Sequence, residues 1–107
     1  MKNPKEIHVK FYSDPGHGWY AVKRKYIKLC NAEGMGISHF SYQRGQTVYL
    51  EEDGDFDIFE VAAELAGFTI KLESSKILDK THPIRSYDAY VEDKEGDLEY
   101  LLSLQFS

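Results

Sequence analysis

The sequence predicts an α+β fold in which residues 1–107 form a single domain, with one mainly antiparallel sheet and helices packed on one face of it. A chain of 107 residues has the size of one domain with its own core. Alternating apolar and polar residues indicate two pairs of strands, and a segment with helical periodicity follows each pair. The predicted element order is ββαββαβ, followed by a C-terminal element. No internal repeat or linker divides the chain.

The first third of the chain predicts a hairpin followed by a short helix. EIHVKFYS (6–13) alternates apolar and polar residues and is typical of a strand. DPGHG (14–18) supplies turn residues, because proline fixes its own φ and glycine permits positive φ. GWYAVKR (18–24) is the predicted returning strand. KRKYIKLCNAEG (23–34) then has the apolar spacing of a short helix that Gly34 ends.

A second hairpin and a longer helix are predicted in the middle of the chain. ISHFSYQ (37–43) and QTVYLEED (46–53) are rich in aromatic and β-branched residues and flank a short turn at Arg-Gly. DFDIFEVAAELAG (55–67) has an apolar stripe at helical spacing. Asp55 can cap the start of this helix and Gly67 can end it.

The last third predicts strands separated by a loop. FTIKLES (68–74) alternates again and predicts a strand that returns from the helix. KILDKTHPIRS (76–86) is loop-like, because proline biases the residue before it away from helix. SYDAYVE (86–92) predicts a short final strand. Residues 92–107 form an acidic C-terminal extension, in which the leucines favour a helix over a strand.

Charge is unevenly divided along the chain. Residues 1–50 carry eight Lys and Arg against three acids, a net charge of +5, whereas residues 51–107 carry five against fifteen, a net charge of −10. Such halves predict one basic face and one acidic face. The overall pI near 5.3 argues against nucleic acid as a partner, because phosphate neutralisation drives that affinity.

Cysteine usage and hydropathy indicate the compartment. Cys30 is the only cysteine, which excludes a disulfide within the chain and favours a reducing environment. Apolar runs of a few residues are too short to span a bilayer, and MKNPKEIHVKF lacks the pattern of a secretory signal. We therefore expect a cytoplasmic protein without a membrane partner.

The acidic stretch EEDGDFD (51–57) suggests a surface that binds a partner. Five carboxylates exceed what one helix terminus needs, and clustered carboxylates favour a basic partner surface. An EF-hand is not expected, because Ile58 stands where a calcium loop needs glycine. The candidate partner-binding residues are these five acids with four aromatic or polar anchors: Glu51, Glu52, Asp53, Asp55, Asp57, Tyr42, Arg44, His17 and Trp19.

The alternative is a ligand-binding or hydrolytic site between the hairpins, lined by Asp14, His17, Arg85 and Tyr87. DPGHG resembles the opening of zinc-dependent N-acetylmuramoyl-L-alanine amidases, in which the histidine of a similar motif binds the metal. That resemblance would make His17 a zinc ligand. The glutamate and Asn-x-His that supply the other ligands in those enzymes are absent here, so we expect no metal and no cofactor. The primary expectation is a protein without enzymatic activity.

Three segments read together resemble a group of small, mostly uncharacterised proteins encoded by bacteriophages and prophages. The segments are SDPGHGWYAVKRK (13–25), SYQRGQTVYLEED (41–53) and IRSYDAY (84–90), and the match covers roughly residues 7–90. The resemblance implies a phage accessory protein in the cytoplasm of a bacterial host. The resemblance implies this genomic context and not a reaction. Together with the clustered carboxylates, the context predicts binding to a host or phage protein with a basic surface, as by an inhibitor of a nucleic-acid enzyme or of a defence system, anti-CRISPR proteins included. Nothing in the sequence indicates the oligomeric state.

Overall fold

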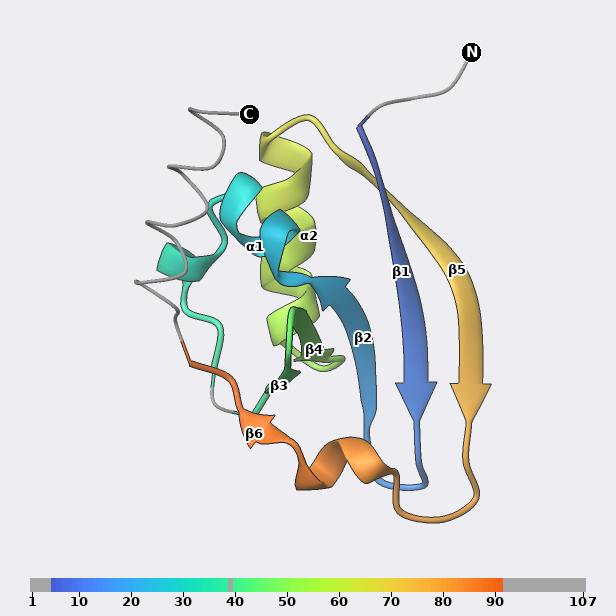
Figure 1. The fold of residues 1–107 in the computed structure, drawn as a ribbon. Coiled ribbons are helices and arrows are strands. Elements are labelled where there is room, and N and C mark those ends of the chain that lie inside the picture. Colours follow the sequence, from blue (N-terminus) through green and yellow to red (C-terminus); the bar gives the residue numbers. More distant parts are fainter. Residues whose placement is uncertain (1–4, 39, 92–107) are drawn as a thin grey trace.

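The two predicted hairpins lie at the centre of a six-stranded sheet (Figure 1). The computed structural model describes residues 5–38 and 40–91. Two short 3₁₀ helices, at Glu33–Met35 and Pro83–Ser86, accompany eight α-helices and strands. These elements are β1 (Glu6–Ser13), β2 (Gly18–Lys23), α1 (Arg24–Leu29), β3 (Tyr42–Arg44), β4 (Thr47–Glu51), α2 (Asp55–Leu65), β5 (Thr69–Ile77) and β6 (Asp88–Ala89).

The sheet is mixed, with the strand order β5-β1-β2-β4-β3-β6. Four of its five strand pairs are antiparallel, and β5 runs parallel to β1 at the edge. The predicted α+β class with one mainly antiparallel sheet is therefore confirmed. The strands after α2 differ from the prediction in detail, because β5 crosses to the far edge and a two-residue strand, β6, pairs with β3.

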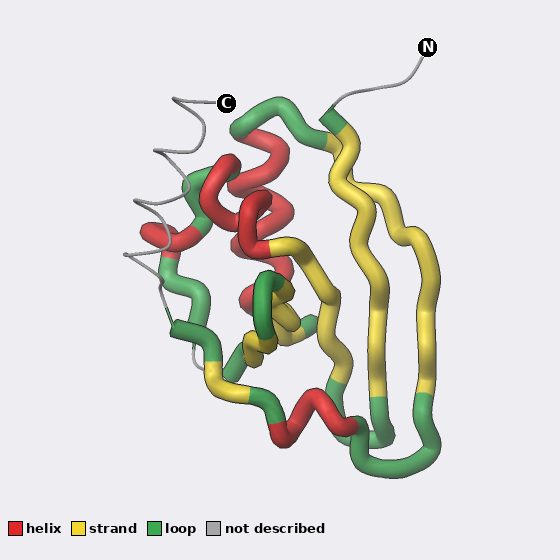
Figure 2. The backbone as a smooth tube through the Cα atoms, viewed as in Figure 1, coloured by secondary structure: helices red, strands yellow, loops and turns green. Residues whose placement is uncertain are grey.

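Both helices pack against the same face of the sheet, as the ribbon and tube views show (Figures 1 and 2). Alternate residues of β1, β2 and β4 point to this face and bury their apolar side chains against the helices. The core is made of Ile7, Val9, Val22, Ile27, Cys30, Ala32, Val48, Leu50, Phe56, Phe59, Ala62, Ala63 and Tyr90. Burial also raises the pKa of the Cys30 thiol, as expected for a packed apolar side chain.

Helix α2 ends as predicted but starts differently. Gly67 has a φ of 85°, its N–H bonds to Glu64, and the N–H of Phe68 bonds to Ala63, which is a Schellman motif. The predicted cap at Asp55 is wrong: Gly54 precedes the helix, without a side-chain cap. The Asp55 carboxylate is buried and points away to another segment of the chain.

That segment also shortens the predicted strand 37–43. The Asp55 Oδ2 atom accepts hydrogen bonds from the Ser38 N–H, the Ser38 hydroxyl and the Ser41 hydroxyl, at 2.6 to 3.1 Å. This carboxylate holds the chain in a loop, so β3 begins only at Tyr42. Helix α1 is also shorter than predicted, because Asn31 takes the left-handed conformation at φ 56° before Gly34 is reached.

The remaining differences lie near the C-terminus. Strand β5 continues to Ile77, three residues beyond its predicted end, and the predicted loop contains the 3₁₀ helix at Pro83–Ser86. The predicted helix in the acidic extension lies outside the described residues. Within the described part of the chain, no helix has the length and apolar character to cross a membrane.

Candidate functional site

The face of the sheet opposite the helices carries the candidate site. The segment between β5 and β6 crosses one end of this face and covers Trp19, whose side chain is buried between His82, Tyr42 and the Arg85 guanidinium. Beside this cover lies a cavity of about 300 Å³. We name it the His17 cavity, and its lining residues are His17, Trp19, Phe40, Tyr42, Glu51, Asp53 and Arg85.

The turn that carries His17 is fixed by Asp14. The Asp14 Oδ1 atom accepts the N–H groups of Gly16 and His17, at 2.9 and 3.0 Å. Its Oδ2 atom accepts the N–H of His82, from the covering segment, at 3.0 Å. One carboxylate therefore ties the first hairpin to a segment 68 residues later, and His17 is presented from a rigid backbone.

Arg85 completes this anchor. Its Nε and Nη2 atoms donate to the two Asp14 oxygens at 2.6 and 2.8 Å, a bidentate ion pair. The guanidinium of Arg85 and the N–H of His82 hold the pKa of Asp14 well below its usual range. A side chain at position 16 would disturb this ion pair, since a Cβ there would lie 2.6 Å from Arg85 Nη2. Neither Gly16 nor Gly18 has the positive φ that the sequence suggested.

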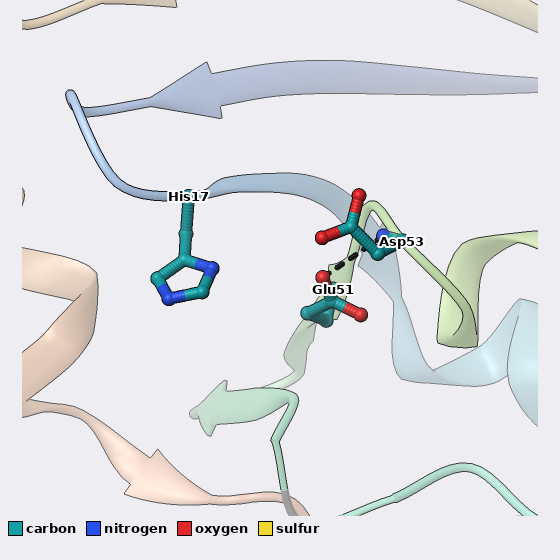
Figure 3. A group of neighbouring side chains, drawn as sticks. All are labelled: His17, Glu51 and Asp53. Carbon is teal, nitrogen blue, oxygen red and sulfur yellow. Dashed lines mark hydrogen bonds between the residues drawn. The ribbon is translucent and has the colours of Figure 1, made fainter.

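His17 lies close to two carboxylates across the cavity, as Figure 3 shows. The ligand atoms of His17, Glu51 and Asp53 all lie within 4.8 Å of one another. His17 comes from the turn after β1, Glu51 from the end of β4 and Asp53 from the turn before α2. The Asp53 N–H donates to Glu51 Oε1 at 2.9 Å, which fixes the Glu51 side chain at the cavity wall (Figure 3).

The cavity is electrostatically negative. Burial raises the pKa of the Glu51 carboxyl, and the nearby charge of Asp53 raises it further against the opposing hydrogen bond from the Asp53 N–H. Asp14 and Arg85 neutralise each other, so the uncompensated charges come from Glu51 and Asp53. Such a site favours a cation: either the side chain of Lys or Arg, or a metal ion held by one imidazole and two carboxylates.

The structure divides the predicted partner-binding residues into three groups. His17, Tyr42, Glu51 and Asp53 line the cavity with one surface of the otherwise buried Trp19. Glu52, Asp57 and Arg44 are exposed outside it. Asp55 is buried in its serine bonds, so it offers nothing to a partner.

The alternative ligand set is brought together in part. Asp14, His17 and Arg85 meet at the turn, but Tyr87 packs elsewhere, with its ring centroid 5.2 Å from that of Tyr49. Arg44 lies over Tyr87, with Cζ 4.9 Å from the ring centroid, and so does not reach the cavity. The sequence predicted the acids and His17 as binding residues but did not predict that they lie close together. Phe40, at the rim of the cavity, was not predicted at all. Only the pairing of β2 with β4, which places Trp19 opposite Glu51, could have signalled this approach.

No protein-family model, curated protein or solved structure matches the chain. The resemblance to phage-encoded proteins therefore stays a prediction from the three sequence motifs.

Proposed function

We propose that this is a non-enzymatic binding protein that captures a basic segment of a partner protein, with a Lys or Arg side chain entering the His17 cavity. One observation supports this most: within the described residues, Glu51 and Asp53 line a cavity and neither forms an ion pair with Lys or Arg. Two carboxylates beside aromatic rings match the chemistry of such a side chain.

The walls of the cavity add attraction beyond charge. Tyr42 and Trp19 lie against each other with ring centroids 6.1 Å apart, and Phe40 is 66% exposed at the rim. A cation over aromatic rings gains about 0.5–2 kcal/mol, more where water is excluded. Exposed Glu52 and Asp57 extend the negative field outside the cavity, which speeds the encounter with a basic surface and makes it sensitive to salt.

The sequence resemblance sets the biological context of this proposal. A phage accessory protein of this kind acts in the cytoplasm of a bacterial host. Its partner is a host or phage protein with a basic surface, because carboxylates can occupy sites that otherwise bind phosphate. Inhibition of a nucleic-acid enzyme or of a defence system, as by an anti-CRISPR protein, is the specific form of this function.

The test is a binding titration with matched variants. Trp19 is the only tryptophan, so its fluorescence reports on the cavity directly. The probes are short alanine-based peptides that contain two arginines or two lysines, with a two-glutamate peptide as the control. We expect the arginine peptide to change Trp19 emission. The double variant Glu51→Gln/Asp53→Asn should weaken its binding by about tenfold, about 1.4 kcal/mol.

The matched control removes the same two charges from the exposed side of α2, as Asp57→Asn/Glu60→Gln. It should change affinity by less than about threefold, through the long-range field alone. Equal losses in the two double variants would show diffuse charge attraction and contradict the proposed cavity. Absence of peptide binding at about 50 mM salt, where such attraction is strong, would contradict it too.

A second candidate function follows from the grouping of His17, Glu51 and Asp53 within 4.8 Å. One imidazole and two carboxylates can bind Zn²⁺ or Mn²⁺ and leave positions open for water, as a hydrolytic module requires. Titration with each metal, followed by Trp19 emission, distinguishes the two candidates. Micromolar metal affinity that His17→Ala abolishes would favour the hydrolytic alternative, whereas peptide binding that persists in His17→Ala favours the binding protein.

A further inference from the structure

No described segment covers the other half of the same sheet face, which forms a hollow of about 370 Å³. We name it the Ala21 hollow. Its lining residues are His8, Lys10, Tyr12, Ala21, Lys23, Thr47, Tyr49 and Glu73. Ala21 forms the floor because it is the smallest residue of its row, paired with Lys10 on β1 and with Tyr49 on β4. Its short side chain leaves a hollow beside the rings of Tyr12 and Tyr49, which meet edge to face with centroids 6.2 Å apart.

Positive charge surrounds the Ala21 hollow. Lys10 and Lys23 are exposed at its rim. The β1–β5 register places Lys71 beside His8 and Lys76 beside Tyr12, so both lysines extend the same face at the sheet edge. Arg44 pairs with Thr47 and extends it on the other side. Among the described residues, the acids on this half of the face are Glu6, which contacts His8 and Lys71, and Glu73. Five Lys and Arg side chains therefore stand against two carboxylates here.

Aromatic side chains run through the middle of this basic surface. The ring centroids of Tyr12 and Tyr49 lie 6.2 Å apart, and those of Tyr49 and Tyr87 lie 5.2 Å apart. The Arg44 guanidinium lies over Tyr87. Each of the three tyrosines is partly exposed. A row of rings between lysines offers stacking surfaces flanked by charges that can neutralise phosphate.

We propose that this open face binds single-stranded nucleic acid, with a base in the Ala21 hollow against Tyr12 or Tyr49 and the phosphates along Lys10, Lys23, Lys71 and Lys76. A single strand suits this surface better than an acidic protein does. It carries planar bases and phosphates along its length, which the rings of Tyr12 and Tyr49 and the surrounding lysines can bind. The net charge of −5 does not oppose this inference locally, since five exposed acids lie elsewhere, on α2 and the turn before it: Glu52, Asp53, Asp57, Glu60 and Glu64.

The expected affinity is modest and strongly dependent on salt. Contact with three or four phosphates gives a slope of log affinity against log salt of about −2 to −3 for a single strand. Fluorescence anisotropy of labelled oligothymidylate and oligouridylate, each about 12 nucleotides long, measures this with the full chain. We expect micromolar dissociation constants at about 50 mM salt.

The matched variants are two lysines that stand two positions apart. Lys23 lies on the open face, whereas Lys25 lies on α1 with its Nζ atom 5.0 Å from the Tyr26 ring centroid, on the helix side. Each change to Glu alters the net charge equally. We expect Lys23→Glu to weaken oligonucleotide binding by about tenfold and Lys25→Glu by less than threefold. Equal effects, or no binding by the wild type, would overturn the proposal.

A second pair of variants tests stacking apart from charge. Tyr12→Phe keeps an aromatic ring at the Ala21 hollow, and Tyr12→Leu removes the ring. Circular dichroism checks the fold of both variants. Loss of a stacked base costs roughly fivefold or more in affinity, so Leu should bind clearly more weakly than Phe. Equal binding of both variants, or equally tight binding of polyglutamate, would show an anion site without base recognition and overturn the proposal. The double variant Glu51→Gln/Asp53→Asn changes the His17 cavity and leaves the lining residues of the Ala21 hollow unchanged. Its affinity for oligonucleotides therefore distinguishes failure of this proposal from failure of the His17 cavity.

Discussion

Two positions of β2 that point to the same side of the sheet have opposite surroundings. Trp19 is 1% exposed beneath the segment that joins β5 to β6, whereas Ala21, two residues later, forms the floor of an open hollow. The covering segment is anchored by Asp14 and reaches only the Trp19 end of the face. Covering a large indole removes much apolar surface from water and is therefore stabilising, whereas covering a methyl group removes little.

The charges of the two halves differ in the same way. Next to Trp19, the bidentate pair of Asp14 and Arg85 is neutral and leaves Glu51 and Asp53 to set the sign of the cavity. Around Ala21, lysines dominate the rim. One sheet face thus offers a site for a cation and a site for an anion. On this face, the size of the β2 side chain sets which half is covered, and the Asp14–Arg85 ion pair sets which charges remain unpaired next to Trp19.

Removal of Asp14, which anchors the covering segment over Trp19, should have the largest effect. In Asp14→Ala, the N–H groups of Gly16, His17 and His82 and the Arg85 guanidinium all lose one acceptor. Buried donors without partners are costly, so we expect the midpoint of thermal unfolding at pH 7 to fall by several degrees. Trp19 emission should shift to longer wavelength as the cover loosens.

Acid should reduce the difference in stability between wild type and Asp14→Ala. The folded-state pKa of Asp14 is lowered, so its contribution to stability is fully present above its ordinary pKa of about 4 and is lost as the pH falls further. The gap in unfolding temperature between wild type and Asp14→Ala should therefore shrink below about pH 4. Asp79→Asn, at an exposed position near the same segment, is the control and should show no gap at any pH. A gap that stays constant down to pH 2 would contradict the assigned role of Asp14.

Two acids of EEDGDFD provide the next largest contrast. Asp55→Ala leaves the buried Ser41 hydroxyl and the Ser38 N–H without their shared acceptor, which should cost about 2–3 kcal/mol of unfolding free energy. Asp53→Ala removes an exposed carboxylate and should cost less than about 0.5 kcal/mol. Urea denaturation measures both. Equal costs would mean that Asp55 is no more structural than its neighbour.

These two acids also show what the sequence could predict. Alternation identified the strands at residues 6–13, 18–24 and 46–53, and the glycine after α2 identified its end, because those signals are local. Asp55 had the position of a helix cap, yet it bonds to serines 14 and 17 residues earlier. Composition cannot separate a surface carboxylate from one that folds inward when both stand in the same acidic run.

Long-range pairing set the remaining limit. Strand β5 pairs in parallel with β1, more than 60 residues away, and no turn signal predicts such a crossover. Asp14 and Arg85 were named together as one ligand set, but their spacing of 71 residues gave no sign of a bidentate pair. Grouping His17 with Glu51 and Asp53 likewise required the β2–β4 register.

His82 allows a smaller test of the cover. Burial lowers its pKa, against the opposing attraction of Asp14, and its Nδ1 atom accepts the Ile84 N–H at the start of the 3₁₀ helix. Because the folded-state pKa is lowered, its contribution to stability is complete above about pH 6.5 and is lost as the pH falls below that value.

Replacing His82 with Asn keeps an acceptor for the Ile84 N–H and removes the titrating group. His82→Asn should therefore flatten the fall in unfolding temperature between pH 7 and pH 5 by a few degrees at most. His17→Asn, at an exposed position of the cavity, should change that slope less. Parallel pH profiles for wild type and His82→Asn would remove His82 from this role.

The smallest expected effect lies at the open end of β2. Ala21→Val adds a β-branched side chain in the Ala21 hollow, which no described segment covers. The unfolding free energy should therefore stay within about 0.5 kcal/mol of wild type or rise slightly. Gly18→Ala adds one carbon on the opposite face of the same strand, 2.6 Å from Phe11 Cζ and 2.7 Å from Glu52 Oε2, and should destabilise the protein. If Ala21→Val is the more destabilising of the two, the hollow is packed rather than open. If it is neutral, the space at Ala21 is free, and filling it with Val should weaken oligonucleotide binding while arginine-peptide binding at the His17 cavity stays unchanged.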